Sequence, residues 1–281
     1  MKIAFVVDSG CDVPQRYIDQ YNMHVVPLYI NYGGESYGDD GKSFDRYAYY
    51  AQLPDIKPLP QTSAPSLEDA RIPIMDALSG ADHVICVSIA AGLSNTNNVM
   101  RLAAEEVSPD RVTIWDSETL SMGCGWQAII GAETAVATGD LAETLAVMKR
   151  VRTRTTVYAA MASLEYLRRG GRVPWAAAAV GNFLRVRPIV DVGDGEVKVA
   201  SRIRTHRAWL EKVISLTQAL APVDRIALLH TDNHDDVESL RERVSDMLPD
   251  TVLTVVASPV IGTHTGPAGI GVATVGQGWR D

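Results

Sequence analysis

The sequence predicts a protein of two α/β domains, the first built on a mainly parallel sheet, with a ligand bound between or beside the domains. Hydrophobic residues make up 46% of the 281 residues, which is enough for a substantial buried core. Short apolar runs typical of buried strands alternate with longer segments in which apolar residues recur at helical spacing. In such folds, ligands bind outside the carboxyl ends of the parallel strands.

The first half of the chain shows this alternation most clearly. We expect strands at residues 2–7, 24–30, 83–89 and 111–115, and helices at residues 66–79, 97–107 and 124–138. The polar segment 31–61 is rich in glycine and proline, which predicts an irregular functional loop with one short helix at 44–52. A surface helix over 140–152 ends the first domain, so the domains are expected to span 1–153 and 154–281.

The second half alternates in the same way. We expect strands at residues 155–160, 225–230, 251–257 and 269–275, and helices at residues 163–169, 174–184, 205–220 and 235–248. A hairpin is predicted over 186–200, because Gly193-Asp194-Gly195 supplies residues that tight turns prefer. Pro174 suits the first turn of its helix, because proline lacks a backbone N–H and a first-turn N–H has no acceptor within the helix.

Charge and cysteine usage narrow the classes of function. The formal net charge of −8 argues against nucleic acid, whose binding normally needs a basic surface. Cys11, Cys86 and Cys124 are far apart and lack metal-binding spacing, which predicts reduced cysteines, no metal site and a cytoplasmic protein, with Cys86 in a buried strand. The apolar start before Asp8 is too short for a secretory leader, and no run approaches the roughly 20 apolar residues of a membrane span.

Three polar loops carry the strongest functional signal. They are Thr62-Ser63-Ala64-Pro65-Ser66, Gly92-Leu93-Ser94-Asn95-Thr96-Asn97 and Gly262-Thr263-His264-Thr265-Gly266-Pro267. The first two lead into predicted helices, and Ser66 with Asp69 forms a capping-box pattern. Free N–H groups and the positive dipole end of a helix, together with hydroxyls, suit a carboxylate or a phosphate. The other interpretation is that these residues are ordinary helix caps.

Taken together, motifs along the whole chain make it resemble the DegV family of bacterial fatty-acid-binding proteins. The matching stretches are Ile3-Ala4-Phe5-Val6-Val7-Asp8-Ser9, Thr62-Ser63-x-Pro65-Ser66, Leu93-Ser94-x-Thr96, Asp116-Ser117, Leu167-Arg168-Arg169-Gly170-Gly171-Arg172, Arg187-Pro188-Ile189, Arg204-Thr205 and His264-x-Gly266-Pro267. The chain departs from the usual family residue at Asn95, Asn97, Arg187 and Ala268. The first two departures lie beside the expected head-group loop and bear on acyl-chain preference.

The resemblance implies where a fatty acid would bind. Its carboxylate is expected against the hydroxyls of Thr62 and Ser94, with Ser63 in the same loop. His264 is expected near the head group, and Thr265 and Gly266 belong to its loop. Arg172 could recognise the carboxylate, although an arginine and a glycine at this place also suit a helix C-terminus. No role is assigned to the other arginines of this region, Arg168, Arg169 and Arg204.

The resemblance also implies a tunnel and a partner. The acyl chain, of about C14–C20, would run through the second domain and the seam between the domains, where Trp175 to Leu184 offers small side chains that could also serve close helix packing. A separate fatty acid kinase would phosphorylate the bound carboxylate. Since no nucleotide-binding motif is present, the chain would be the carrier rather than the enzyme, with no cofactor besides its fatty acid.

Three alternatives remain open from the residues. The chain could be a small-molecule phosphotransferase or hydrolase that uses Ser94, His264 and Asp116. It could be a regulatory interaction protein with an incidental lipid. Asp8 and Asp116 could hold a magnesium ion beside a phosphate, although capping at the ends of strands explains both carboxylates equally well.

Overall fold

A parallel sheet of four strands forms one end of the molecule. The computed structural model describes residues 1–41, 44–177 and 186–280. In the sheet order β2-β1-β6-β7, all three neighbouring pairs are parallel. The strands are β1 (Ile3–Asp8), β2 (His24–Val26), β6 (His83–Ser88) and β7 (Val112–Asp116). Every residue of β6 is buried, as expected for a parallel strand that has helices on both of its faces.

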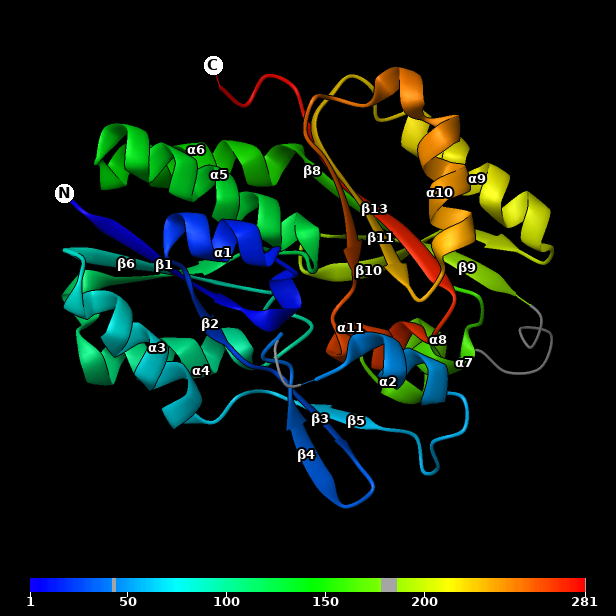
Figure 1. Cartoon of the computed structure of the whole chain (residues 1–281), viewed down its shortest axis with the longest axis horizontal. Helices are drawn as coiled ribbons and strands as arrows, with labels where there is room; N and C mark the ends of the chain where they lie inside the picture. The colour runs from blue at the N-terminus through cyan, green and yellow to red at the C-terminus, as the bar shows by residue number, and fades with distance from the viewer. Residues whose placement is uncertain (42–43, 178–185, 281) are drawn as a thin grey trace.

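Helices cover both faces of this sheet (Figure 1). The helices are α1 (Gln15–Tyr21), α3 (Leu67–Ser79), α4 (Thr96–Val107), α5 (Met122–Thr138) and α6 (Leu141–Arg154). Val6 and Val84 pack against α3 and α4 on one face, whereas Phe5 and Ile85 pack against α5 on the other. Strand residues alternate between faces, so one apolar run supplies both cores. The capping box that Ser66 and Asp69 predict begins α3.

The segment expected to be irregular contains a small antiparallel sheet instead. Its order is β4-β3-β5, from β3 (Tyr29–Tyr32), β4 (Glu35–Gly38) and β5 (Gln61–Ser63), and the short helix α2 (Arg46–Gln52) precedes β5. The expected single strand over 24–30 is wrong, because the chain leaves β2 at Pro27, which cannot donate a ladder hydrogen bond. Gly33 and Gly34 form a two-residue hairpin turn with φ of 63° and 86°.

The second half of the chain forms a mixed sheet in the order β10-β9-β8-β13-β11-β12. Its strands are β8 (Thr155–Ala160), β9 (Arg187–Gly193), β10 (Glu196–Ile203), β11 (Val223–Thr231), β12 (Val252–Val256) and β13 (Gly269–Gly276). Among the described strands of this sheet, only the pair β11–β12 is parallel. The predicted hairpin forms, and its turn residues Asp194 and Gly195 have φ of 54° and 76°.

The helices of this half differ from the expected ones in three places. They are α7 (Glu165–Gly170), α8 (Pro174–Ala177), α9 (His206–Gln218), α10 (His234–Arg243) and α11 (Pro259–Thr265). The helix expected over 174–184 begins as α8, and its residues 178–184 lie outside the described part of the chain. The helix expected over 235–248 ends at Arg243, followed by a short 3₁₀ turn. Finally, α11 was not expected, and it places His264 on a helix rather than in a loop.

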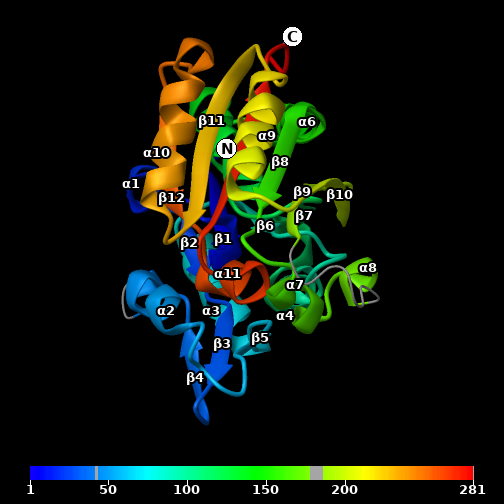
Figure 2. The same ribbon diagram turned by 90° about the vertical axis from the view of Figure 1, so that its right-hand side faces the viewer.

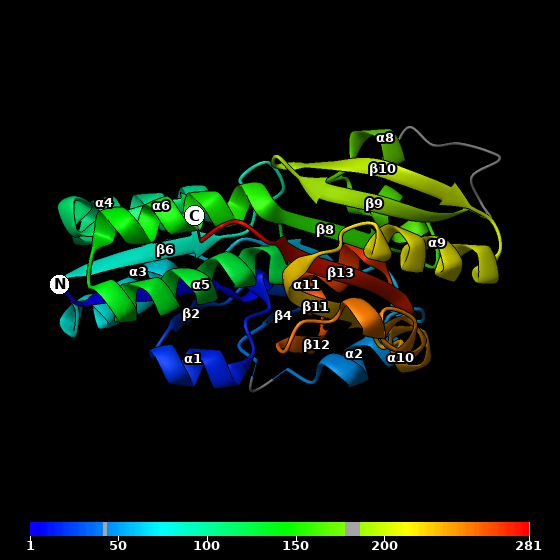
Figure 3. The same ribbon diagram turned by 90° about the horizontal axis from the view of Figure 1, so that it is seen from above.

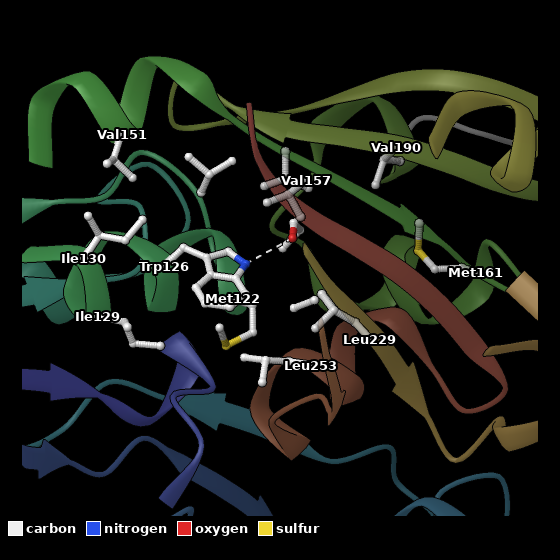
Figure 4. Packing of buried hydrophobic residues seen from close by; sticks show 14 of the residues in the cluster. Met122, Trp126, Ile129, Ile130, Val151, Val157, Met161, Val190, Leu229 and Leu253 are labelled. Atoms are coloured by element: carbon white, nitrogen blue, oxygen red, sulfur yellow. Dashed lines mark hydrogen bonds between the residues drawn. The ribbon is translucent and has the colours of Figure 1, made fainter. Parts of the chain in front are cut away.

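Helix α5 joins the two larger sheets (Figures 1 and 3). Cys124 and Ala128 of α5 pack with the four-stranded sheet, whereas Trp126 packs under the six-stranded sheet. Trp126 Nε1 donates to the carbonyl of Ala273 at 3.1 Å, as Figure 4 shows among the surrounding buried side chains. The four-stranded and three-stranded sheets use strands before residue 117, and the six-stranded sheet uses strands after residue 154. The domain division itself stays a prediction.

The structure corrects the expectation of reduced cysteines. Cys11 and Cys124 form a disulfide, although they are separated by 113 residues in the sequence. Cys11 follows β1 and Cys124 lies in the first turn of α5, and the fold brings these two places together. Cys86 is buried in β6, as expected. Among the described residues, no helix is long and apolar enough to cross a membrane.

Candidate binding site

A cavity of about 530 Å³ lies where the three polar loops meet the six-stranded sheet. Most of its wall is aliphatic, from Leu28, Leu93, Leu120, Ala159, Met161, Leu167, Val173, Val190, Val192, Val197, Val260 and Ile261. Its polar lining includes the predicted residues Thr62, Ser63, Ser94, Arg172, His264 and Thr265. A largely apolar wall with a few polar groups is typical of a small-molecule site.

Thr62 and His264 meet in this wall from opposite ends of the chain. The pairing of Thr62 with Ile30 holds it in β5, and His264 occupies the last turn of α11. Thr62 Oγ1 and His264 Nε2 form a hydrogen bond of 2.8 Å. Figure 2 shows α11 between the six-stranded sheet and the small sheet, and α11 contacts β3 and β5 of the small sheet.

Two tyrosines of α2 fix α11, and the sequence alone did not reveal this role. The hydroxyl of Tyr50 donates to the carbonyls of Ala257 and Ser258, at 2.8 and 3.0 Å, where α11 begins. The hydroxyl of Tyr49 lies 2.6 Å from Thr263 Oγ1. Because both tyrosines are fully buried, they hold the helix that carries His264 against the small sheet.

The environment of His264 keeps its imidazole neutral. Burial lowers the pKa of His264 to about 4, and the positive charge of Arg172 adds to this effect. None of the described residues hydrogen-bonds its buried Nδ1, which lies against the backbone of Gly170. A ring nitrogen that faces C–H groups is better placed as a lone pair than as an N–H donor. This geometry favours the Nε2–H tautomer, so that His264 donates to Thr62 and leaves the threonine O–H free to donate into the cavity.

Thr96 orients the hydroxyl of Ser94 in a similar way. The backbone N–H of Thr96 donates to Ser94 Oγ at 3.2 Å, and Thr96 Oγ1 lies 2.7 Å from the same oxygen. When the Thr96 hydroxyl donates in this pair, the Ser94 O–H is free to point at a ligand. The start of α4 at Thr96 therefore places a second hydroxyl donor on the cavity.

The other predicted residues lie at the edges of the cavity. Ser63 and Arg172 are exposed beside it, with Ser63 Oγ accepting from Asn31 and Arg172 donating to the Gly170 carbonyl. Thr265 lines the wall and donates its hydroxyl to Ile261. Gly266 is not among the described residues that line the cavity. It ends α11, where an added Cβ would lie 2.4 Å from the ring of Tyr166.

The described part of the apolar wall comes largely from the second half of the chain. Val190 and Val192 of β9 and Val197 of β10 form one side, and Leu167 and Val173 flank the turn after α7. Of the small-residue segment, Trp175 donates from Nε1 to the carbonyl of Val197 at 2.9 Å. The part of that segment beyond Ala177, including Phe183 and Leu184, lies outside the described residues.

The residues of the hydrolase and magnesium alternatives are occupied by other contacts. The Asp116 carboxylate accepts from the backbone N–H groups of Ala91 and Glu118, and Asp8 accepts from Gly10 and Ile89. Within the described residues, no hydrogen bond links Ser94, His264 and Asp116 to one another, and no cluster of three or more potential ligands could hold a metal ion. Both aspartates therefore act as caps at the ends of their strands.

Comparison with known proteins decides the family. The family model described as "Uncharacterised protein, DegV family" matches residues 2–277. The chain belongs to the DegV family. A DegV domain-containing protein of Streptomyces coelicolor is 32% identical over 277 residues, which cover 96% of this chain and 97% of the relative. The resemblance inferred from the sequence motifs is thus confirmed.

Solved DegV structures show the same fold. A DegV family protein from Thermus thermophilus, described as binding fatty acid, is 32% identical, with a TM-score of 0.89 over 98% of this chain and 100% of that chain. A DegV lipid-binding protein from Thermotoga maritima is 25% identical, with a TM-score of 0.87 over 98% of each chain. The α/β fold class with a parallel first sheet is therefore confirmed.

Three departures from the usual DegV residues have visible contacts in this structure. Asn97 donates from Nδ2 to Ser88 Oγ at 2.9 Å and so ties α4 to the end of β6. Arg187 lies over the ring of Trp209, with 5.6 Å from its Cζ to the ring centroid. Ala268 has φ of 59°, a left-handed conformation that the usual glycine would adopt without strain.

Proposed function

We propose that this DegV protein binds one long-chain fatty acid in the cavity of about 530 Å³. The observation that carries the proposal is a mostly aliphatic wall that ends at the hydroxyls of Thr62 and Ser94. Burial of each CH₂ contributes about 0.8 kcal/mol, so a chain of about C14–C20 gains on the order of 10 kcal/mol before the costs of binding are subtracted. The relative from Thermus thermophilus, described as binding fatty acid, supports the same ligand class.

In this proposal the two hydroxyls hold the carboxylate. Thr62, oriented by His264, and Ser94, oriented by Thr96, each donate a charge-assisted hydrogen bond to a carboxylate oxygen. Ser63 and Thr265 border the head group, and Gly266 shapes the end of α11. Arg172 adds positive charge at the exposed edge of the cavity.

We further propose that the protein is a cytoplasmic carrier and that a separate fatty acid kinase phosphorylates the bound carboxylate. The exposure of Ser63, Asn95 and Arg172 beside the cavity supports access from outside to the head group. In the kinase complex a carboxylate oxygen attacks the γ-phosphorus of ATP, which forms an acyl-phosphate and releases ADP. The carrier itself contributes binding and orientation of the carboxylate.

Lipid extraction followed by mass spectrometry tests the ligand. Gently purified protein should carry about one C14–C20 fatty acid per chain, and delipidated protein should take such acids up again. Failure of delipidated, folded protein to bind any of them would exclude the proposed ligand class. With ATP and magnesium alone the protein should form no acyl-phosphate. Product formed without a partner would favour the enzyme alternative.

A further inference from the structure

A second, smaller cavity of about 40 Å³ adjoins the main cavity. Five residues line both cavities and form the neck between them: Leu120, Ala159, Met161, Ile261 and Thr265. Beyond the neck, the apolar lining comes from Val157, Leu229, Ala257 and Ile270. Figure 4 shows Val157, Leu229 and Met161 among the buried side chains of this region.

The hydroxyl groups in the wall of the second cavity already have hydrogen-bond partners. Ser121 donates its hydroxyl to Asp12 at 2.6 Å, and Thr231 donates its hydroxyl to the carbonyl of Gly266 at 2.8 Å. His230 accepts at Nδ1 from a backbone N–H. A buried water needs two to four polar partners, so this cavity suits an apolar group better than water.

Met161 and Ala159 are two of the residues that line the neck. Met161 is almost fully buried, at 1% exposure, and its backbone N–H is fixed to the carbonyl of Pro188 at 3.0 Å. Its side chain is unbranched and adapts readily to neighbouring shapes. Ala159 contributes only a methyl group at the same neck. A flexible methionine beside an alanine on the same face of the strand leaves room at the neck for a slender hydrocarbon chain.

We propose that the second cavity receives the terminal carbons of the longest acyl chains and that Met161 controls this extension. The inference rests on the proposed binding of a fatty acid in the main cavity. A single water needs about 10–15 Å³ by the same measure of volume, so the second cavity holds roughly three groups of that size. It therefore accommodates about the last two or three carbons of a chain.

The proposal predicts affinities that depend on chain length. Each additional buried methylene strengthens binding about fourfold, as long as the cavity has room for it. Filling the second cavity should therefore lower the affinity for the longest chains roughly tenfold or more. The affinity for chains that end before the neck should not change. Widening the neck should favour the longest chains instead.

The test measures the affinity of delipidated protein for four saturated acids: dodecanoate, myristate, palmitate and stearate. Leu229→Phe fills the second cavity from β11, and Met161→Ala widens the neck. Val197→Leu is the matched control, because its larger side chain narrows the main cavity on the side of β10. We expect Leu229→Phe to lower the affinity for stearate at least tenfold and to leave the affinity for dodecanoate unchanged. Met161→Ala should raise the affinity for stearate relative to that for dodecanoate. Val197→Leu should change the affinities for all four acids by similar factors.

Equal shifts for all four acids in both Leu229→Phe and Met161→Ala would overturn the proposal. A thermal melt confirms that each variant is folded, and if Leu229→Phe fails to fold, Met161→Ala alone decides the outcome. Wild-type protein that binds none of the acids would refute the proposed function. If the wild-type protein binds the acids but the variants change affinity equally at every chain length, only the role of the second cavity is refuted.

Discussion

The backbone of Gly170 lies directly against the imidazole of His264. A Cβ built on Gly170 would be 2.2 Å from Nδ1, far inside van der Waals contact. The end of α7 therefore packs on the histidine that orients Thr62, and no larger residue fits there without moving one of the two. The first glycine of the Gly170-Gly171 pair thus belongs structurally to the candidate site.

Gly170→Ala should destabilise the protein and weaken fatty-acid binding. Alanine normally stabilises a helical position by up to about 1 kcal/mol relative to glycine, so a loss would show that the clash with His264 dominates. Overpacking of this kind costs about 1–3 kcal/mol. Urea unfolding and a fluorescence displacement assay for fatty acid measure the two effects. An unchanged or improved stability would mean that His264 moves freely and is not held by Gly170.

Gly193→Ala provides the control for this substitution. A Cβ on Gly193 would meet no heavy atom within 4 Å, and its φ is not in the left-handed region. The change should therefore leave stability within about 0.5 kcal/mol of wild type. Comparable losses in both variants would point to a general effect of replacing glycine.

Ser94→Ala should weaken fatty-acid binding while the fold remains intact. Loss of one charge-assisted hydrogen bond typically costs about 1.5–3 kcal/mol, or roughly tenfold to a hundredfold in affinity. The acyl chain keeps its apolar contacts, so binding should be reduced rather than abolished. Transfer of phosphate by a partner kinase should fall further than affinity, because the carboxylate loses its orientation. Unchanged affinity and transfer would place the carboxylate elsewhere.

Thr62→Val should have a similar effect on binding and a second effect on His264. Valine removes the hydroxyl at nearly constant volume, so Nε2 of His264 loses its partner as well. We expect weaker fatty-acid binding together with a modest loss of thermal stability. Ser66→Ala is the control, since Ser66 caps α3 nearby and its loss should cost about 1 kcal/mol of stability without changing affinity. If Ser66→Ala weakens binding as much as Thr62→Val, the loop acts only as a helix cap.

Local sequence patterns predicted the elements that depend on local contacts. The continuous apolar run of β6 predicted a buried parallel strand, and Ser66 with Asp69 predicted the start of α3. Two missed elements also had local signals. Gly33-Gly34 is a typical two-residue hairpin turn, and Ser258-Pro259 is a typical start for a helix such as α11.

Other features depend on contacts between distant segments, and the sequence of one chain does not reveal them. The disulfide joins Cys11 to Cys124 across 113 residues, and the bond between Thr62 and His264 joins segments 202 residues apart. The hydroxyl residues were predicted as a group from their loops and the family resemblance. The way His264 orients Thr62 became visible only when β5 and α11 were placed together.

Protonation of His264 should destabilise the folded protein. Its pKa is lowered from 6.5 to about 4 by burial and by Arg172, so the folded state binds this proton less tightly than the unfolded chain. Its contribution to stability is therefore fully present above pH 6.5 and is lost as the pH falls toward 4, by up to about 3 kcal/mol. Comparison of the pH dependence of unfolding in wild type and His264→Gln isolates this contribution. NMR should show a neutral His264 ring at pH 6, and a charged ring there would contradict the argument.

Arg46 joins two buried carboxylates near the places where the three sheets meet. It donates to Asp12 at 3.0 Å and to Asp39 at 3.1 Å, and it also donates to the carbonyl of Val256 at 2.8 Å. Both aspartate side chains are completely buried, and the hydroxyls of Ser121 and Ser258 also donate to Asp12 and Asp39, respectively. Removal of the arginine would therefore leave two negative charges buried beside each other.

Arg46→Met should destabilise the protein by about 3–5 kcal/mol at neutral pH, because breaking a buried ion pair leaves its partners uncompensated. Burial already raises the pKa of Asp12 to about 6 against the opposing effect of Arg46, so loss of the arginine should raise that pKa further. A carboxyl group with a raised pKa stabilises the fold at low pH and loses that contribution as the pH rises. The difference in the free energy of unfolding between wild type and Arg46→Met should consequently shrink as the pH falls from 7 toward 4. Urea unfolding at several pH values measures this dependence. Arg71→Met is the control: it breaks an exposed ion pair with Glu68 and should leave stability nearly unchanged at every pH. A deficit that does not vary with pH would show that the aspartates are neutralised by other groups.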